Sequence, residues 1–328
     1  MELPIELRTA IDQSVEGQPA KQLAEAARGL SERYRTRRAG RLVHGDLQAT
    51  AYAAYRMPAT YAAVAGALDE AGARQPAFQP KTLLDVGGGP GTAAWAAVAV
   101  WPEIERATIL DRDRAMIALG KRLAAASREA ALRGARWLEA DALAMPLPPA
   151  ELVTEAYTLN ELQPDQAETV VRRLWDATLH TLVLVEPGTP DGYHAVHEAA
   201  AVLPEANVIA PAPGDWNCLA SEGDWLHFSA RVPRTRLLRH IKQGELSYED
   251  EKYAYVVLSR HPGLPIVARV IRHPQIRPGR IALVLCTWGG VLEIVVTRSN
   301  KPAYRLAKTL VWGSPISQQE AAQLGLDV

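Results

Sequence analysis

The chain has 328 residues, with 36 Lys or Arg and 37 Asp or Glu, so its formal charge is −1. This length predicts about two domains and a core that needs no disulfides, and two cysteines exclude a secreted disulfide framework. The N-terminal segment lacks the apolar core of a signal peptide, and no later stretch is long and apolar enough to span a membrane. We therefore expect a cytoplasmic protein with no membrane partner.

The charge is unevenly distributed along the chain. From Ser229 to the C-terminus there are 15 basic and seven acidic side chains, a net charge of +8, which leaves −9 for the remainder. Segregated positive charge of this kind favours a polyanionic partner. Two ordinarily solvated surfaces would explain the same counts, so charge alone leaves both interpretations open.

The first half of the chain changes from a helical to an alternating pattern. Residues 1–75 are rich in Ala, Leu, Glu and Arg, with apolar positions at three- and four-residue spacing, which predicts a helical region. Strand-like runs then alternate with helical patterns; the runs are 82–89, 107–113, 135–141, 151–159 and 181–190. Parallel strands need crossover helices of this length, so residues 76–205 are predicted to form a doubly wound, Rossmann-like α/β domain.

A third region is expected over residues 206–328. Pro, Gly and Asp dominate 210–225, which predicts a long irregular loop, and a short basic helix is expected over 234–244. Strands are predicted at 253–260, 268–274, 279–287 and 291–298, with a hairpin turn at the glycine pair 289–290. These elements predict a small antiparallel β module at the C-terminus.

The strongest local motif is LLDVGGGPGT at 83–92, where the first strand of the α/β domain meets a helix. Glycines there allow the backbone to approach a ligand, and the helix N-terminus offers unpaired N–H groups. The spacing differs from the dinucleotide fingerprint. Asp85, Gly87, Gly89 and Gly91 instead match the arrangement of class I S-adenosylmethionine-dependent methyltransferases, and we predict that they bind this cofactor.

Two further acids support a cofactor site. Asp111 ends the second strand, about 20 residues after Gly91, where a ribose-binding carboxylate is expected. Asp141 ends the third strand, where such methyltransferases place an acidic or polar contact to the adenine. Each acid has a plainer interpretation as the cap of a helix.

Candidate catalytic residues follow the fourth strand. Asn160 and Glu161 are placed to bind or deprotonate a methyl acceptor, although a helix cap explains them equally well. The chain lacks the Asn/Asp-Pro-Pro-aromatic tetrad of many base-amine methyltransferases at this point. His194 and His197 lie three residues apart without a third ligand nearby, so no metal site is predicted.

Several segments together resemble the Rsm22 family of methyltransferase-like proteins of the mitochondrial and bacterial small ribosomal subunit. The matching stretches are YRMPATYAAV at 55–64, LLDVGGGPGTAAWAA at 83–97, LDRDRAMIALG at 110–120, YTLNEL at 157–162, LVLVEPGTPDGY at 182–193 and the segment 224–260. VEPGTP and YEDEKYAY are far more specific than the glycine loop. The resemblance implies a methyltransferase-like fold associated with the small ribosomal subunit and its ribosomal RNA.

The same resemblance implies four cysteine ligands of an iron–sulfur cluster in many members. At the corresponding positions this chain has Ala212, Cys218, Leu226 and Cys286. Because Ala and Leu offer no donor atom, we expect no iron–sulfur cluster. Whether the two cysteines pair is left open.

The basic C-terminal part is a candidate RNA-binding region. Its densest cluster consists of Arg231, Arg234, Arg236, Arg239 and Lys242, which we predict to contact phosphates. The leading hypothesis is a methyltransferase-like protein that binds S-adenosylmethionine and contacts or methylates small-subunit ribosomal RNA. The alternatives are a non-catalytic assembly factor that uses the fold as an RNA-binding scaffold, and a small-molecule methyltransferase, which would not need the basic region.

Overall fold

The computed structural model describes residues 2–36, 45–213, 223–234 and 247–326. The chain begins with four helices that confirm the predicted helical region: α1 (Ile5–Val15), α2 (Ala20–Thr36), α3 (Asp46–Tyr55) and α4 (Met57–Arg74). The long helix α4 is buried over most of its length because small alanines allow it to pack closely. It contacts the strands β5 (Thr178–Pro187) and β8 (Tyr248–Ser259) and the helix α5 (Thr92–Val100).

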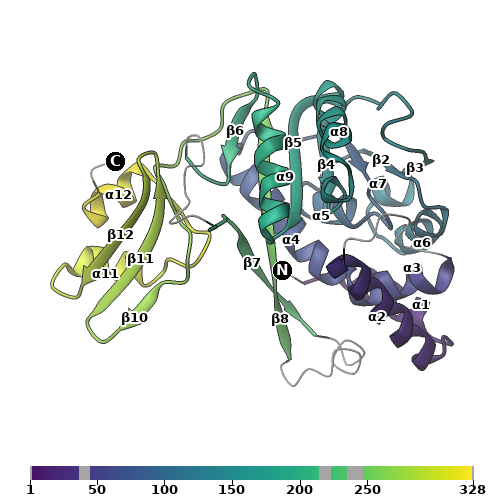
Figure 1. Cartoon of the computed structure of the whole chain (residues 1–328), viewed down its shortest axis with the longest axis horizontal. Coiled ribbons are helices and arrows are strands. Elements are labelled where there is room, and N and C mark those ends of the chain that lie inside the picture. The colour runs from purple at the N-terminus through teal and green to yellow at the C-terminus, as the bar shows by residue number, and fades with distance from the viewer. Residues whose placement is uncertain (1, 37–44, 214–222, 235–246, 327–328) are drawn as a thin grey trace.

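A large mixed sheet forms the centre of the molecule (Figure 1). In spatial order its strands are β3 (Arg136–Glu139), β2 (Arg106–Asp111), β1 (Thr82–Val86), β4 (Ala150–Ala156), β5 (Thr178–Pro187), β8 (Tyr248–Ser259) and β6 (Asn207–Ala210). The first five are parallel, whereas β8 runs antiparallel to both of its neighbours. This arrangement confirms the predicted α/β fold.

Crossover helices connect the parallel strands. They are α5, α6 (Arg114–Ala125), α7 (Ala130–Arg133), α8 (Pro164–Ala177) and α9 (Pro190–Ala201). Helix α5 packs on β1 and α4, while α8 and α9 pack on each other and on β5. The helical segment that follows β2 is divided, because α6 ends at Ala125 and α7 begins only at Ala130. None of the described helices combines the length and apolar composition that a membrane crossing requires.

The strand predicted over 253–260 belongs to the large sheet rather than to the small C-terminal sheet. Residues Tyr253–Ser259 of β8 are all buried between β5 and β6. A continuous apolar run predicts a buried strand but does not indicate which sheet receives it. The first half of β8 pairs with β7 (Phe228–Pro233) in a two-stranded extension, the β7–β8 ribbon, which projects from the body in Figure 1.

The C-terminal module contains a second, smaller sheet with its own core. Its strands are β9 (Ala268–Val270), β10 (Gln275–Arg277), β11 (Arg280–Thr287), β12 (Gly290–Thr297) and β13 (Pro315–Ile316). Helices α11 (Lys301–Ala307) and α12 (Gln318–Leu324) complete it. The predicted hairpin turn is present, since Thr287 pairs with Gly290. The division into domains at residues 75 and 205 stays a prediction, although the large sheet continues past residue 205 through β6, β7 and β8.

The buried Arg269 connects this module to the N-terminal helices. Its guanidinium forms an ion pair with Glu70 of α4, and it also donates to the carbonyl of Gly313 at 2.6 Å. A second ion pair joins Arg272 to Asp224. Charged anchors of this kind fix the orientation of the module, because leaving either partner alone would bury an uncompensated charge.

Candidate functional site

The glycine loop between β1 and α5 adopts a conformation that only glycine tolerates well. Gly87, Gly89 and Gly91 have φ angles of 68°, 54° and 85°, in the left-handed region. A Cβ atom added to Gly87 would lie 2.7 Å from a side-chain carbon of Thr158, and one on Gly91 would lie 3.0 Å from Trp137. Both the backbone angles and the packing therefore require these glycines.

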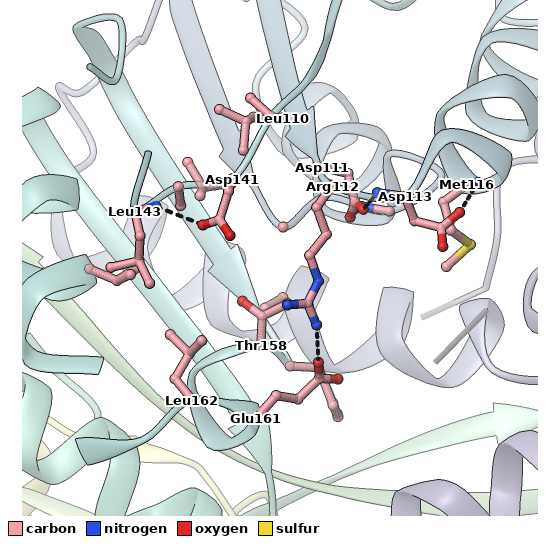
Figure 2. A pocket seen from close by; sticks show the side chains of 18 of the residues that line it. Leu110, Asp111, Arg112, Asp113, Met116, Asp141, Leu143, Thr158, Glu161 and Leu162 are labelled. Atoms are coloured by element: carbon pink, nitrogen blue, oxygen red, sulfur yellow. Dashed lines mark hydrogen bonds and ion pairs between the residues drawn. The ribbon is translucent and has the colours of Figure 1, made fainter. Parts of the chain in front are cut away.

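The pocket of interest lies beside this loop, at the carboxyl ends of β1, β2, β3 and β4 (Figure 2). This is the edge of a doubly wound sheet where ligands bind, at the point where the strand order reverses. Five of the predicted site residues line it: Gly87, Gly89, Asp111, Asp141 and Glu161. Asp85, Gly91 and Asn160 are outside its lining.

Asp111 joins the ends of β1 and β2. Its Oδ2 atom accepts a hydrogen bond from the N–H of Gly89 at 2.7 Å, and Oδ1 accepts from the N–H of Asp113 at 2.7 Å. Burial raises the pKa of this carboxyl, and the two backbone hydrogen bonds oppose that shift. Since each carboxylate oxygen has two acceptor sites, capacity is left for hydroxyl donors of a ligand.

Asp85 acts behind the loop rather than in the pocket. It is fully buried; Oδ1 accepts from the hydroxyl of Thr154 at 3.0 Å, and Oδ2 accepts from the N–H of Ala94 at 3.2 Å. Burial raises its pKa to about 7. The side chain thus ties β4 and the first turn of α5 to β1, and its contribution to a ligand site is to hold the loop.

Asp141 and Glu161 lie on opposite sides of the pocket in Figure 2. Asp141 is exposed, and its Oδ1 accepts from the N–H of Leu143 at 2.8 Å. Glu161 belongs to the short helix η1 (Leu159–Glu161), and Arg112 extends across the pocket to within 3.5 Å of it. Although Glu161 is an exposed residue, partial desolvation of its carboxylate in the pocket raises its pKa to about 7, while Arg112 acts to lower it.

Two buried glutamates hold η1 in place. Glu155 and Glu186 end β4 and β5, and both accept from the N–H of Leu159, at 3.1 and 2.9 Å. Burial raises the pKa of Glu155 to about 7, and burial together with the charge of Glu155 raises the pKa of Glu186 well above its ordinary value. Like charges this close disfavour double ionisation, and this repulsion adds to burial in raising the pKa of Glu186.

Two tyrosines that were not among the predicted site residues complete the pocket. Tyr52 reaches it from α3, and Tyr157 follows β4 with a φ of 64°. A bulky residue in the left-handed region is strained and is held there by its surroundings. The Tyr157 hydroxyl donates to Glu251 of β8 at 3.1 Å, and Arg56 donates to both oxygens of the same carboxylate at 2.7 and 3.2 Å.

The sequence motifs do not point equally to these additional residues. Arg112 directly follows Asp111, and Tyr157 and Thr158 belong to the YTLNEL stretch, so the sequence motifs already include these residues. Tyr52 lies in an alanine-rich helix with no local signal of a ligand site. Its role depends on the packing of α3 against α6, which comes much later in the chain.

The predicted RNA-binding residues are only partly described. Arg231 and Arg234 lie at the β7 side of the ribbon and pair with Asp250 and Glu249, at 2.9 and 3.2 Å. Arg236, Arg239 and Lys242 lie outside the described residues. The RNA contact of this cluster stays a prediction.

The structure describes three of the four positions that correspond to cysteine ligands. Ala212, Leu226 and Cys286 are buried in one hydrophobic core cluster, whereas Cys218 lies outside the described residues. In the described part of the chain, no group of three or more His, Cys, Asp or Glu side chains is arranged to hold a metal ion. Ala212 and Leu226 supply no ligand atom, and the expectation of no iron–sulfur cluster stays a prediction.

A family model and a curated relative point to the same family. The model of the family described as "Mitochondrial small ribosomal subunit Rsm22" matches residues 46–317. The human "Ribosome assembly protein METTL17, mitochondrial" is 31% identical over 291 residues, which are 80% of this chain and 61% of that protein. The chain therefore spans about three fifths of the length of this curated relative.

Solved structures are similar to part of the chain, with low TM-scores. Magnesium protoporphyrin IX methyltransferase from Synechocystis with bound SAM has a TM-score of 0.39 at 11% identity, covering 70% of this chain and 91% of that one. The YcgJ protein from Bacillus subtilis has a TM-score of 0.40 at 12% identity, covering 61% of this chain and 99% of that one.

The predicted cytoplasmic location is wrong. The matched family model describes a mitochondrial small-subunit protein, and the human relative is a mitochondrial protein. The prediction rested on the lack of a secretory signal and of a membrane span, and neither feature distinguishes the cytoplasm from a mitochondrion.

Proposed function

The chain belongs to the Rsm22 family of small ribosomal subunit proteins, and from this premise we propose that it binds S-adenosylmethionine and acts on the small ribosomal subunit. The observation that carries the cofactor proposal is the contact between the glycine loop and Asp111. The N–H of Gly89 is bound by the carboxylate that ends the neighbouring strand, so the loop and the acid form one rigid wall of the pocket.

The residues present fit this cofactor. Asp111 would accept hydrogen bonds from the ribose hydroxyls, and the glycine loop would lie against the methionine part. Asp141, with the apolar side chains of Leu110 and Leu143, would face the adenine. The bound cofactor would supply an electrophilic methyl group, and the chain would contribute its position relative to an acceptor.

Glu161 is the proposed proton acceptor. Its pKa of about 7 allows it to take up a proton near neutral pH, and it lines the pocket from η1. Asn160, the second candidate, is outside the lining and would contact an acceptor only from the rim of the pocket.

A non-catalytic scaffold is supported by one observation. Glu161 is paired with Arg112, which extends across the pocket, so the only proposed proton acceptor is already engaged. In this alternative the chain would contact ribosomal RNA through its basic residues, including Arg231, Arg234, Arg236, Arg239 and Lys242, without transferring a methyl group.

Two measurements on the full chain test the proposal. Isothermal titration with S-adenosylmethionine should show saturable binding, which the Asp111→Ala substitution weakens at least about tenfold, as expected for the loss of charge-assisted hydrogen bonds. Asp176→Ala, at an exposed site on α8, is the matched control. Equal affinity of wild type and Asp111→Ala would contradict the ribose assignment.

Methyl transfer is tested separately. Labelled S-adenosylmethionine is incubated with immature small subunits, and incorporation into RNA is compared between wild type and Glu161→Gln. Incorporation that Glu161→Gln abolishes supports an enzyme. Cofactor binding without incorporation supports the scaffold.

A further inference from the structure

A cluster of exposed basic side chains lies on the C-terminal module. We call it the outer basic patch, and its members are Arg277, Arg280, Arg298, Lys301, Arg305 and Lys308. All six are exposed. Within the described ranges, none of them has a carboxylate at ion-pair distance.

Backbone pairing brings the three arginines together. Arg277 of β10 lies directly opposite Arg280 of β11, on either side of a tight turn. Arg298 follows β12, and its N–H donates to the carbonyl of Gly279 in that turn at 2.9 Å. Directly opposed side chains on antiparallel strands have Cβ atoms about 5 Å apart, so the two positive charges on β10 and β11 repel at close range.

Helix α11 extends the patch beyond Arg298. Lys301, Arg305 and Lys308 are spaced four and three residues apart, so they share one side of the helix and its end. The other side is held in the module, where Ala303 and Ala307 are buried in its core. Figure 1 shows α11 on the side of the module that faces away from the large sheet.

The pairing of other arginines makes this patch distinctive. On the ribbon, Arg231 and Arg234 are neutralised by acids of the opposite strand. Arg272, in the module itself, pairs with Asp224. Positive charge in the described C-terminal part is thus largely compensated near the body and uncompensated at the outer end.

We propose that the outer basic patch is a binding surface for the phosphate backbone of RNA. The proposal rests on the proposed function, because it takes small-subunit ribosomal RNA as the partner. Several closely spaced cations match a row of phosphates, and each contact releases a bound counterion. Guanidinium groups also bind phosphate oxygens in a bidentate manner.

The surroundings favour RNA over a membrane surface. An amphipathic helix that binds lipid needs a free apolar face, whereas α11 buries its apolar residues in the core of the module. Strands and a short helix fix the backbone positions of the six residues, which suits contact with an RNA backbone. Contacts of this type position a protein on RNA and do not read its sequence.

The test uses the full chain with a triple substitution, Arg298→Gln, Lys301→Gln and Arg305→Gln. The matched control carries Lys121→Gln, Arg122→Gln and Arg128→Gln, which remove the same charge from exposed sites on and after α6. Binding of a fluorescein-labelled single-stranded fragment of small-subunit ribosomal RNA is followed by anisotropy over a series of salt concentrations. Circular dichroism checks that both variants are folded.

The expected result is a loss of affinity of at least about tenfold in the patch variant. Its slope of log affinity against log salt should be shallower by about 2, since each phosphate contact on a single strand contributes about 0.7. The control should bind as the wild type does. Patch and control variants that bind RNA equally would overturn the proposal while leaving the proposed function intact, whereas a wild type that binds no RNA would overturn both. Binding to phosphatidylserine vesicles that alone depends on the patch would identify a membrane contact and also overturn it.

Discussion

The hydroxyl of Tyr157 donates a hydrogen bond to Oε1 of Glu251 at 3.1 Å, although 94 positions separate the two residues in the chain. Glu251 belongs to the strand that continues into the β7–β8 ribbon, and Tyr157 lines the pocket. Arg56, between α3 and α4, binds the same carboxylate. One carboxylate therefore joins the N-terminal helices, the pocket and the ribbon.

Substitutions at Tyr157 and Glu251 should distinguish the contribution of their hydrogen bond to stability from that of the ion pair with Arg56. Tyr157→Phe keeps the ring and removes one hydrogen bond, so the free energy of unfolding should fall by about 1 kcal/mol. Glu251→Ala also removes a bidentate carboxylate partner of the half-buried Arg56 and should cost at least about 2 kcal/mol. Urea denaturation of both variants measures this. Equal costs would show that the charge of Arg56 is fully solvated without Glu251.

A comparison of Gly87 with Gly17 distinguishes the cost of a steric clash from the cost of an unfavourable φ angle. Gly87 and Gly17 both have φ near 70–80°, at 68° and 81°, but only Gly87 would place a Cβ against a neighbour. Gly17→Ala should cost about 1 kcal/mol from its φ angle alone. Gly87→Ala should cost more and should also weaken S-adenosylmethionine binding, because Thr158 must move within the pocket. Denaturation and titration calorimetry measure the two effects. Unchanged cofactor affinity in Gly87→Ala would place the ligand away from the loop.

Whether a residue of this site can be predicted from the sequence depends on how far apart in the chain its contacts lie. The glycine loop and Asp111 could be predicted because each sits at a strand end whose neighbours are close in the chain. Tyr52 and Arg56 could not, since their contribution depends on α3 packing against α6 and on α4 packing against β5 and β8, which come much later in the chain. The strand β8 was recognised from its apolar run, but its place beside β5 is decided by long-range pairing.

Buried acids make stability depend on pH. Burial raises the pKa of both Asp85 and Glu155 to about 7. The folded state therefore binds these protons more tightly than the unfolded state does. Their contribution is fully present below about pH 4, the ordinary range of a carboxyl pKa, and is lost as the pH rises through 7.

The free energy of unfolding should thus decrease between pH 5 and pH 8, by up to about 1.4 kcal/mol per pH unit for each group. Glu155→Gln replaces one of these acids by a neutral amide and should flatten the dependence. Glu168→Gln, on the exposed surface of α8, should leave it unchanged. Urea denaturation across this pH range provides the measurement. A stability that rises with pH over the same interval would contradict the role of the buried acids.

The anchor of the C-terminal module can be tested at Glu70. Its carboxylate faces the buried guanidinium of Arg269, which is 1% exposed, and it also pairs with Arg74 of the same helix at 3.2 Å. Glu70→Gln should destabilise the chain by about 3 kcal/mol, because a buried cation loses its counter-charge. Hydrogen exchange should accelerate first in β9, where Arg269 lies. Glu103→Gln, at an exposed loop position, is the control.

The outer basic patch predicts opposite effects on stability and on binding. Arg277 and Arg280 lie opposite each other, and the described part of the chain places no carboxylate at ion-pair distance from either, so Arg277→Gln removes a repulsion and should raise the free energy of unfolding by about 0.5 kcal/mol. The same substitution removes one phosphate contact and should weaken RNA binding, with a salt slope shallower by about 0.7. If Arg277 served only the stability of the module, replacing it would not raise the free energy of unfolding. Thermal denaturation and anisotropy titration on one preparation measure both quantities, and a loss of stability without a change in RNA affinity would show that Arg277 serves the module rather than a ligand.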